Sequence, residues 1–410
     1  MRSRHPALCL CLLLACVTFA IEPTAGAADW TRFRGPNGTG VAADKNVPVQ
    51  WNDQNILWKV VLPGGGNSSP IIYGDKLFIQ SADAKSRMLL CIDVKDGKII
   101  WNKSVPGGTA KTHAKSSLAS STPATDGERV YCYFWDGKDV SVSAFDFKGN
   151  PVWHRVLGAF ESQHGAGASP MLVDGKVIVN NDQDGKSELI ALDAKTGQPA
   201  WQVPRPPFRA CYSTPFVLEK NGKTELIVVS TAGVTSYNPK TGGQNWNWEW
   251  KFDGMALRTV GSAVAANGII FAGSGDGSGA RHMVAVRDDG KGLVWQEKKV
   301  MPYVPCMLTQ GEHLYYVNDR GIAGCLDGKT GKEVWSQRLP GTGVFASPVL
   351  IDGKIYASSE DGSVTVYEAA PAFKQLAKNS IPEPILASPA VANDRLYIRG
   401  KTTLYCIGKK

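Results

Sequence analysis

Six polar side chains at related positions of a repeated pattern are the best candidates for a binding site in this 410-residue chain. They are His164, Arg209, Thr342, Glu383, Arg258 and His113. The first four lie six residues before a proline that follows Ser or Thr, Arg258 is one residue out of register, and His113 lies in the longest equivalent segment, 106–121. Arginine, and histidine below about pH 6.5, would attract an acidic ligand or an acidic peptide. We expect these side chains at the surface around one channel mouth, with Glu383 on the far rim; alternatively, they line a wet channel or cap strand ends.

Other motifs that could carry chemistry are better explained as structure. The oxygen-rich run 180–185 lacks the bidentate glutamate of a calcium loop, and matching positions elsewhere are ordinary turns. Residues 273–277 hold only a degenerate Gly-x-Ser-x-Gly motif, without the strand-to-helix setting of a nucleophile. Cys91, Cys325 and Cys406 occupy repeat positions where other copies hold alanine or serine, which indicates small buried positions. We therefore assign no catalytic residue and no metal ligand.

A motif of Asp, Gly and Trp at regular spacing recurs along the chain and must position the polar side chains. The fuller copies are Asp93, Gly97 and Trp101, then Asp193, Gly197 and Trp201, then Asp327, Gly331 and Trp335; further copies end at Trp153, Trp246 and Trp295. The aspartate can accept hydrogen bonds from N–H groups of its own turn, and the glycine supplies a positive φ angle. The tryptophan would lie across the neighbouring unit. These residues are expected to be structural, as is Trp58 on an N-terminal strand.

A second repeated feature, a Ser-Pro or Thr-Pro pair, marks eight units. The pairs begin at Ser69, Thr122, Ser169, Thr214, Ser347 and Ser388, with degenerate copies at Ser262 and Val304. Their spacing of 41 to 53 residues is typical of propeller blades, and each unit reads as short strands separated by turn sequences. The sequence predicts an all-β, eight-bladed β-propeller of four-stranded antiparallel blades. The last unit supplies three strands, so the N-terminal strand 56–61 should complete it and remove an open sheet edge.

The first residues have the pattern of an export signal. A basic start, the apolar run 7–21 and a small-residue cleavage site predict a signal peptide over 1–27, a leader segment 28–55 and the propeller over 56–410. Alternatively, Cys16 would carry lipid at a lipobox-like site. No apolar stretch is long enough for a transmembrane span, and the absence of a basic helix argues against nucleic-acid binding. We expect an exported protein of the periplasm or cell envelope.

This pattern resembles the PQQ-like, or quinoprotein-type, β-propeller repeat family, which includes the BamB-like proteins of outer-membrane assembly. The resemblance covers residues 56–410, and segment 29–38 looks like the leader of exported family members from planctomycete-type bacteria. In the PQQ-dependent dehydrogenases of this family, the quinone lies over a tryptophan floor, under a disulfide of adjacent cysteines, and binds calcium through Glu, Asn and Asp. The chain has no adjacent cysteine pair. No cofactor is therefore predicted, and PQQ with calcium is the alternative.

The resemblance, together with the weak catalytic motifs, favours a non-enzymatic exported scaffold. As a monomer, it would bind a protein of the cell envelope or an acidic ligand. Enzymatic activity stays open at this point. One alternative is a PQQ-binding protein similar to the quinoprotein dehydrogenases. The other is a carbohydrate-binding propeller in which exposed Trp135 or Trp250 would stack on sugar rings.

Overall fold

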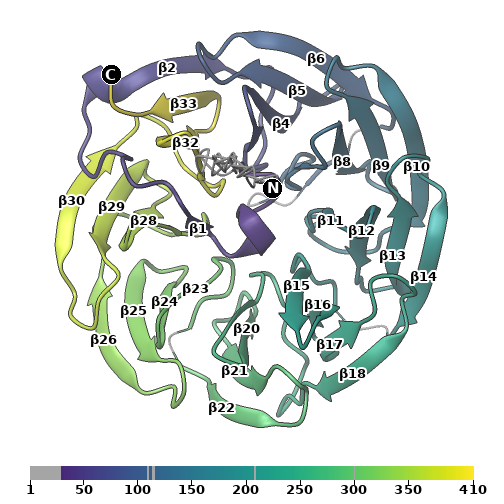
Figure 1. The fold of residues 1–410 in the computed structure, drawn as a ribbon, viewed down its shortest axis with the longest axis vertical. Coiled ribbons are helices and arrows are strands. Elements are labelled where there is room, and N and C mark those ends of the chain that lie inside the picture. Colours follow the sequence, from purple (N-terminus) through teal and green to yellow (C-terminus); the bar gives the residue numbers. More distant parts are fainter. Residues whose placement is uncertain (1–28, 109, 113–115, 207–208, 300) are drawn as a thin grey trace, which may run out of the picture.

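The computed structural model of the protein describes residues 29–108, 110–112, 116–206, 209–299 and 301–410. The predicted signal peptide 1–27 and His113 lie outside these residues. Eight four-stranded antiparallel sheets follow one another in a ring (Figure 1), each running from an inner strand at the centre to an outer strand at the rim. The predicted eight-bladed β-propeller is confirmed.

The first four blades follow the chain order without exception. Blade one contains β3 (Ile71–Tyr73), β4 (Lys76–Ala82), β5 (Arg87–Asp93) and β6 (Ile99–Val105). Blade two contains β7 (Ala124–Thr125), β8 (Arg129–Trp135), β9 (Asp139–Asp146) and β10 (Pro151–Ala159). Blade three contains β11 (Met171–Val173), β12 (Lys176–Asn181), β13 (Ser187–Asp193) and β14 (Pro199–Arg205). Blade four contains β15 (Phe216–Lys220), β16 (Lys223–Ser230), β17 (Gly233–Tyr237) and β18 (Gln244–Glu249).

The remaining blades include two N-terminal strands, β1 (Val41–Ala42) and β2 (Ile56–Val61). Blade five contains β19 (Val264–Ala266), β20 (Ile269–Gly275), β21 (Arg281–Arg287) and β22 (Leu293–Glu297). Blade six contains β23 (Leu308–Gln310), β24 (His313–Val317), β25 (Ile322–Asp327) and β26 (Glu333–Arg338). Blade seven contains β27 (Val349–Ile351), β28 (Lys354–Ser358), β29 (Ser363–Glu368) and β30 (Gln375–Ser380), with β1 added at its inner edge. Blade eight contains β31 (Ala390–Ala392), β32 (Arg395–Arg399), β33 (Thr403–Ile407) and β2.

The N-terminal strand β2 closes the ring as predicted. It runs antiparallel to β33, with Trp58 opposite Cys406 and Val61 opposite Thr403. Blade eight thus has four strands, although the C-terminal part of the chain supplies only three. Because β33 would otherwise present an open edge, pairing the two ends of the chain in one sheet satisfies its backbone hydrogen bonds.

The repeated Asp, Gly and Trp residues join consecutive blades. In blade three, the Asp193 carboxylate accepts hydrogen bonds from the N–H groups of Lys195 and Thr196 at 3.1 and 2.8 Å. Gly197 has a φ angle of 69°, and a Cβ atom there would come within 2.5 Å of the Trp153 ring of blade two. Trp153 Nε1 also donates to a backbone carbonyl of blade three at 3.0 Å. In this blade the aspartate and glycine thus shape their own turn, and the glycine makes room for the tryptophan of the preceding blade.

We call the first residue of each Ser-Pro or Thr-Pro pair, or of its degenerate copy, an anchor; the anchors form a chain of hydrogen bonds around the centre of the ring. The N–H of each anchor donates to the side chain of the next, at 2.9 to 3.4 Å, in the order Ser69, Thr122, Ser169, Thr214, Ser262, Cys306, Ser347 and Ser388. The expectation of Val304 as the sixth anchor was wrong. Every anchor lies two residues before its inner strand, and in blade six that residue is Cys306. Between blades eight and one, the Ser69 hydroxyl has no partner among the described residues, and the buried Arg399 guanidinium instead donates to two carbonyls of blade one at 3.1 and 2.7 Å.

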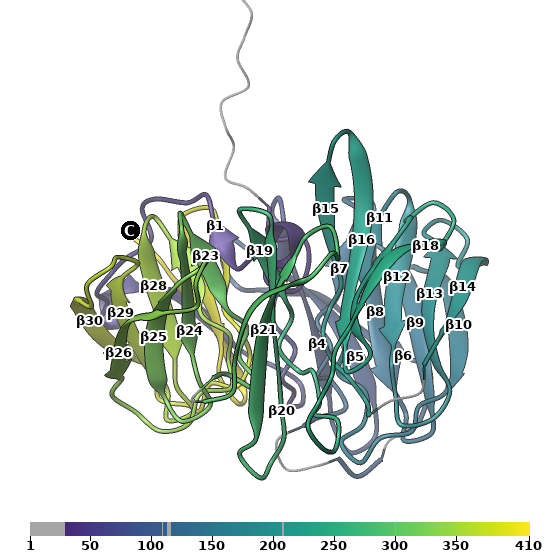
Figure 2. The same cartoon turned by 90° about the horizontal axis from the view of Figure 1, so that it is seen from below.

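The leader segment crosses one end of the ring and is part of the fold. Its 3-10 turn η1 (Pro36–Gly38) and β1 lie near the centre of the ring in Figure 1 and toward the upper edge in Figure 2. Trp30 exchanges two backbone hydrogen bonds with Ile72 of blade one at 2.9 Å, and β1 runs parallel to β27 of blade seven. A second 3-10 turn, η2 (Asp53–Asn55), leads into β2. The leader thus connects blades one and seven, which flank blade eight.

Two buried arginines of the leader reach the inner strands. The Arg32 guanidinium donates to the Pro215 carbonyl of blade four at 2.5 Å. The Arg34 guanidinium donates to the carbonyls of Met307 in blade six and Pro348 in blade seven at 2.6 and 3.1 Å. Burial lowers the pKa of Arg32 to about 10 and also lowers the pKa of Arg34. Backbone carbonyls, which would otherwise lack donors, therefore hold these cations at the centre of the ring.

Blade seven lacks the repeated tryptophan, and the leader contributes one instead. Ala377 stands opposite Val366 where other blades have the ring. Trp51 of the leader belongs to the same buried hydrophobic cluster as Ala377. The backbone N–H of Trp51 donates to the Asn379 side-chain oxygen at 2.9 Å, and the Asn379 side-chain nitrogen donates to the Val49 carbonyl at 2.9 Å. The leader is therefore bound to the outer strand of blade seven as well as to the centre of the ring.

Candidate functional site

The two ends of the ring differ in what covers them. The leader crosses one end, and the connectors from the outer strand of each blade to the inner strand of the next run over the other. We call this second surface the connector face. It is defined by the described connector residues 62–70, 106–108, 110–112, 116–123, 160–170, 206, 209–215, 250–263, 298–299, 301–307, 339–348 and 381–389. The described candidate residues all lie on these connectors, and their binding role stays a prediction.

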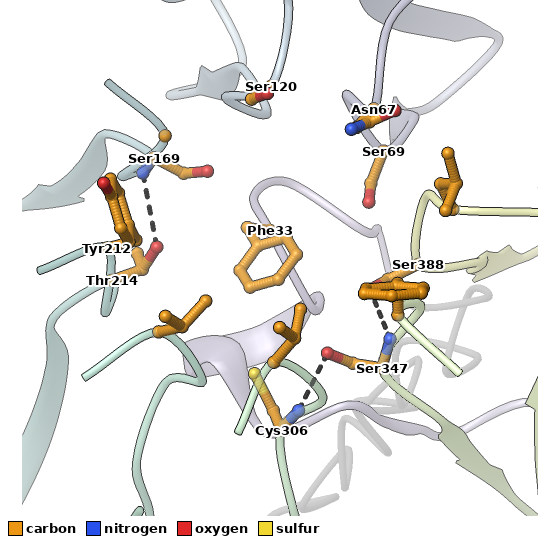
Figure 3. A pocket seen from close by; sticks show the side chains of 15 residues that line it. Phe33, Asn67, Ser69, Ser120, Ser169, Tyr212, Thr214, Cys306, Ser347 and Ser388 are labelled. Carbon is orange, nitrogen blue, oxygen red and sulfur yellow. Dashed lines mark hydrogen bonds between the residues drawn. The ribbon is translucent and has the colours of Figure 1, made fainter. Parts of the chain in front are cut away.

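A cavity of about 120 Å³ lies at the centre of the ring (Figure 3). Phe33 of the leader stands in the middle of this view, surrounded by anchor side chains that include Ser69, Ser169, Cys306 and Ser347. Because most anchor side chains accept a backbone N–H, their own hydroxyl hydrogens remain available as donors. The cavity is therefore polar and hydroxyl-lined, with an aromatic residue from the leader.

The described lining of this cavity does not fit PQQ. It contains hydroxyl, amide, thiol and apolar side chains but no arginine, lysine, aspartate or glutamate. PQQ is a polyanionic quinone, which would need cationic partners or a calcium ion with carboxylate ligands. Its aromatic lining residues are Phe33, Tyr212 and Phe345, whereas the resemblance to the dehydrogenases implies a tryptophan floor.

Arg209 and Arg258 lie on neighbouring connectors of the connector face. The expectation that Arg258 lies at the surface was wrong: it is 4% exposed, because its backbone pairs with Gly275 at the end of β20. Its Nη2 lies 3.8 Å from Asp184 Oδ2, and its Nη1 has no hydrogen-bond partner among the described residues. Arg209 is half-buried, and its Nη1 donates to the Ala256 carbonyl at 3.1 Å. Neighbouring connectors thus carry one buried and one half-buried cation.

The other candidate residues lie on separate connectors. Glu383 acts as a brace within blade eight, because its carboxylate accepts hydrogen bonds from the N–H of Thr402 at 2.6 Å and the hydroxyl of Tyr405 at 3.1 Å. Thr342 is exposed, and its N–H donates to a serine of blade seven at 2.9 Å. His164 is half-buried. His113 lies outside the described residues.

Several residues of this face escaped the sequence analysis. Tyr303 lies between the cations: burial raises its pKa to about 12, although Arg258, Arg209 and Arg281 act in the opposite direction. The Arg281 guanidinium stacks on the Tyr303 ring at 5.0 Å. Met255 is 77% exposed and its sulfur lies 3.6 Å from Arg209 Nη1. All three residues lie on a connector or next to the turn between the second and third strands of a blade. An alignment of the blade sequences with one another could therefore have identified them.

The basis for sugar stacking was wrong for Trp250. Its side chain is 3% exposed, stacks on Phe252 at 5.5 Å and donates through Nε1 to His282 Nδ1 at 3.1 Å. Trp135 is half-buried, and its ring would lie within 2.9 Å of a Cβ atom at Gly165. The Trp250 ring therefore presents no free face to solvent, whereas stacking of a sugar on Trp135 stays a prediction.

The described residues contain no group of three or more His, Cys, Asp or Glu side chains that could hold a metal ion. All six cysteines from Cys91 to Cys406 are buried and free. Within the same part of the chain, no helix has the length and hydropathy needed to cross a membrane.

Comparison with known proteins identifies a family and its fold. The family model of the outer membrane protein assembly factor BamB matches residues 29–165, 142–337 and 293–375. A stretch of 165 residues is 28% identical to BamB of Shewanella oneidensis, covering 37% of this chain and 38% of that protein. A match of 383 residues to a quinohemoprotein alcohol dehydrogenase of Pseudomonas putida, at 20% identity, covers 86% of this chain and 52% of that protein.

The chain thus spans less than two thirds of the length of these two curated relatives. Among solved structures, BamB from Moraxella catarrhalis has a TM-score of 0.62 and 15% sequence identity, and the match covers 86% of this chain and 96% of that one. At this identity the likeness extends to the fold, which agrees with the propeller described above.

Proposed function

The chain belongs to the family of the outer membrane protein assembly factor BamB, and we propose that it is an exported, non-enzymatic scaffold of the cell envelope. It binds a partner protein through the connector face. The opposite end of the ring is crossed by the leader, whose arginines and β1 occupy its centre. The connector face carries the connectors between consecutive blades, and loops on a rigid scaffold commonly carry binding residues.

The observation that carries this proposal is the exposed Met255 next to Arg209. Met255 is 77% exposed, which makes it the most exposed of the large apolar side chains in the described chain. A flexible thioether beside a guanidinium suits a protein interface, because methionine and arginine are both enriched there. A partner would bury the methionine and place an acidic or carbonyl group against the arginine.

Affinity capture from the cell envelope tests this function. We expect Met255→Ala combined with Arg209→Ala to lose a partner that the unmodified protein retains. Lys195→Ala combined with Lys148→Ala removes side chains from turns at the opposite end of the ring and serves as the matched control. Loss of the partner with the control pair, or capture unchanged by the connector-face pair, would overturn the proposal.

Export and oligomeric state belong to the same proposal. The mature N-terminus should follow Ala27, or it should be a lipid-modified Cys16 if the lipobox-like site is used. Mass spectrometry of the protein from its native envelope separates these two outcomes, and an uncleaved Met1 contradicts both. Light scattering should give the mass of one chain.

A quinoprotein dehydrogenase remains the second candidate function, favoured by the match to the alcohol dehydrogenase over 86% of the chain. The uncharged lining of the central cavity argues against it. We expect the mature protein, incubated with PQQ and calcium, to reduce no artificial electron acceptor with common alcohols or sugars. Turnover above a boiled control that is lost on calcium removal would instead support the dehydrogenase.

A further inference from the structure

A second pocket on the connector face, about 180 Å³ in volume, lies between blades five and six. The turn before β21, the turn after β24 and three residues between β22 and β23, namely Lys298, Lys299 and Met301, surround it. Its charged lining residues are Arg281, Lys298, Lys299, Arg320 and Asp319. Four cationic side chains and one carboxylate thus line the same pocket. None of these residues belongs to the set that the sequence analysis selected.

The carboxylate of this pocket is already engaged by the protein. Asp319 Oδ1 accepts the N–H of Val304 at 3.0 Å, and Oδ2 accepts the N–H of Tyr303 at 2.9 Å. Arg281 Nη2 lies 3.5 Å from the same Oδ2. Asp319 therefore fixes the connector and balances at most one of the surrounding cations. The pocket keeps a net positive charge.

Two cations at the rim have no carboxylate of their own. Lys298 pairs with Asp253, but Lys299 and Arg320 form no ion pair with any described residue. Both side chains are exposed. An exposed cation that has no ion-pair partner is attracted to an anion and stays hydrated while it is unbound. Lys299 and Arg320 are therefore suited to bind a carboxylate.

The base of the pocket is rigid. The side chains of Arg281 and Asp319 are each 14% exposed. Arg281 Nη1 also donates to the carbonyls of Asp276 and Ala280 at 2.8 Å, and its guanidinium stacks on Tyr303. A cation held in this way needs no reordering when an anion binds, which lowers the entropic cost of binding.

From this geometry we propose that the pocket binds carboxylate side chains of an acidic peptide segment in a partner protein. This inference deepens the proposed function and rests on it, because it assigns the partner's chemistry to a second position on the connector face. The acidic segment would place one carboxylate between Lys299 and Arg320 at the rim. Met255 and Arg209 would contact a different part of the same partner.

Binding of labelled peptides tests the inference directly. Fluorescence anisotropy would compare an oligo-glutamate peptide with an oligo-glutamine peptide of equal length on the mature protein at low salt. We expect the acidic peptide alone to bind, and Lys299→Ala combined with Arg320→Ala to weaken it about tenfold. Raising the salt concentration should weaken it as well, because both rim cations are exposed.

The matched control removes two exposed lysines at the other end of the ring, Lys329→Ala and Lys374→Ala. This pair should leave the affinity for the acidic peptide within about twofold. Arg320→Lys in an otherwise unmodified chain should keep most of the affinity. Equal losses for the control and the pocket pair, or equal binding of the neutral peptide, would overturn the inference. Saturable binding of inorganic phosphate without binding of the peptide would also overturn it.

The two proposals fail separately. If Met255 and Arg209 are required for partner capture but the acidic peptide does not bind, the scaffold function stands and the pocket assignment falls. If the peptide binds through Lys299 and Arg320 but no envelope partner depends on the connector face, the affinity of the pocket for carboxylates stands, whereas the scaffold function is refuted, and with it the assignment of the acidic segment to a partner protein.

Discussion

Replacing Arg34 by methionine should destabilise the propeller, because this side chain joins the leader to two blades. Arg34 is 1% exposed and donates to the carbonyls of Met307 and Pro348 at 2.6 and 3.1 Å. It also donates to Thr39 and Gly38 within the leader at 2.9 and 3.2 Å. A hydrogen bond that involves a charged group contributes about 1.5 to 3 kcal/mol.

Loss of the two hydrogen bonds from Arg34 to the carbonyls of blades six and seven should therefore cost about 3 to 6 kcal/mol. Burying an uncharged side chain recovers part of the desolvation penalty of the cation. We expect Arg34→Met to lower the free energy of unfolding by about 3 kcal/mol. Urea unfolding at 25 °C measures this value from the shift in midpoint at unchanged slope.

The control is Arg287→Met, whose side chain is 58% exposed and pairs with Asp289 on the surface. It should change the free energy of unfolding by no more than about 0.5 kcal/mol. Limited proteolysis should also cut the leader of Arg34→Met sooner than that of the control. A loss below about 1 kcal/mol for Arg34→Met, or equal losses in both variants, would show that the leader is not held by this guanidinium.

Three further outcomes are expected. Cys306→Ala should cost about 1 to 2 kcal/mol because it leaves the buried N–H of Ser262 without its acceptor, whereas Cys306→Ser should be nearly neutral in the same denaturation assay; equal losses would contradict the hydrogen-bonded ring. Partial burial would raise the pKa of Glu383, but hydrogen bonds from blade eight outweigh it and lower this pKa below its ordinary 4.5. The stabilisation of the fold by the Glu383 carboxylate is therefore present above about pH 4.5, and it is lost as the pH falls through the pKa of the folded state. Thermal melts of Glu383→Gln should accordingly fall below wild type at pH 7 and converge with it in acid, and a constant difference would refute this. Deleting residues 28–62 should destabilise the whole ring by removing β2 and the leader, and an unchanged melting temperature in a monomeric product would show that the closing strand is dispensable.

The fold could be predicted because the repeated Asp, Gly and Trp residues interact at a fixed sequence separation in one blade after another. Asp193 binds N–H groups two and three residues later, and Gly197 meets a tryptophan of the preceding blade. The same relation recurs in other blades, so that repetition alone indicates a propeller. The one error in the anchors, Val304 in place of Cys306, arose because the thiol takes a hydroxyl's position without a following proline.

The candidate site could be predicted only in part. Sequence position correctly assigned the described residues to one end of the ring, because every connector leads to the same face. Sequence position did not reveal which of these side chains are exposed to solvent. Arg258 is buried by pairing with Gly275, and Glu383 is engaged within its own blade. A charged residue in a loop has no local signal that separates a free side chain from one that braces a turn.

The sequence by itself determined the repeat, the number of blades and the closure by residues 56–61, since each follows from hydrophobic pattern and turn chemistry within a blade or between neighbours. Only the tertiary structure decided which end of the ring stays open and where its cations gather. Arg32 and Arg34 find their carbonyl partners 183 and 314 residues away, and the pocket at Arg320 combines segments from two blades. Such contacts depend on the ring being closed, because only closure brings the leader and all eight blades to a common centre.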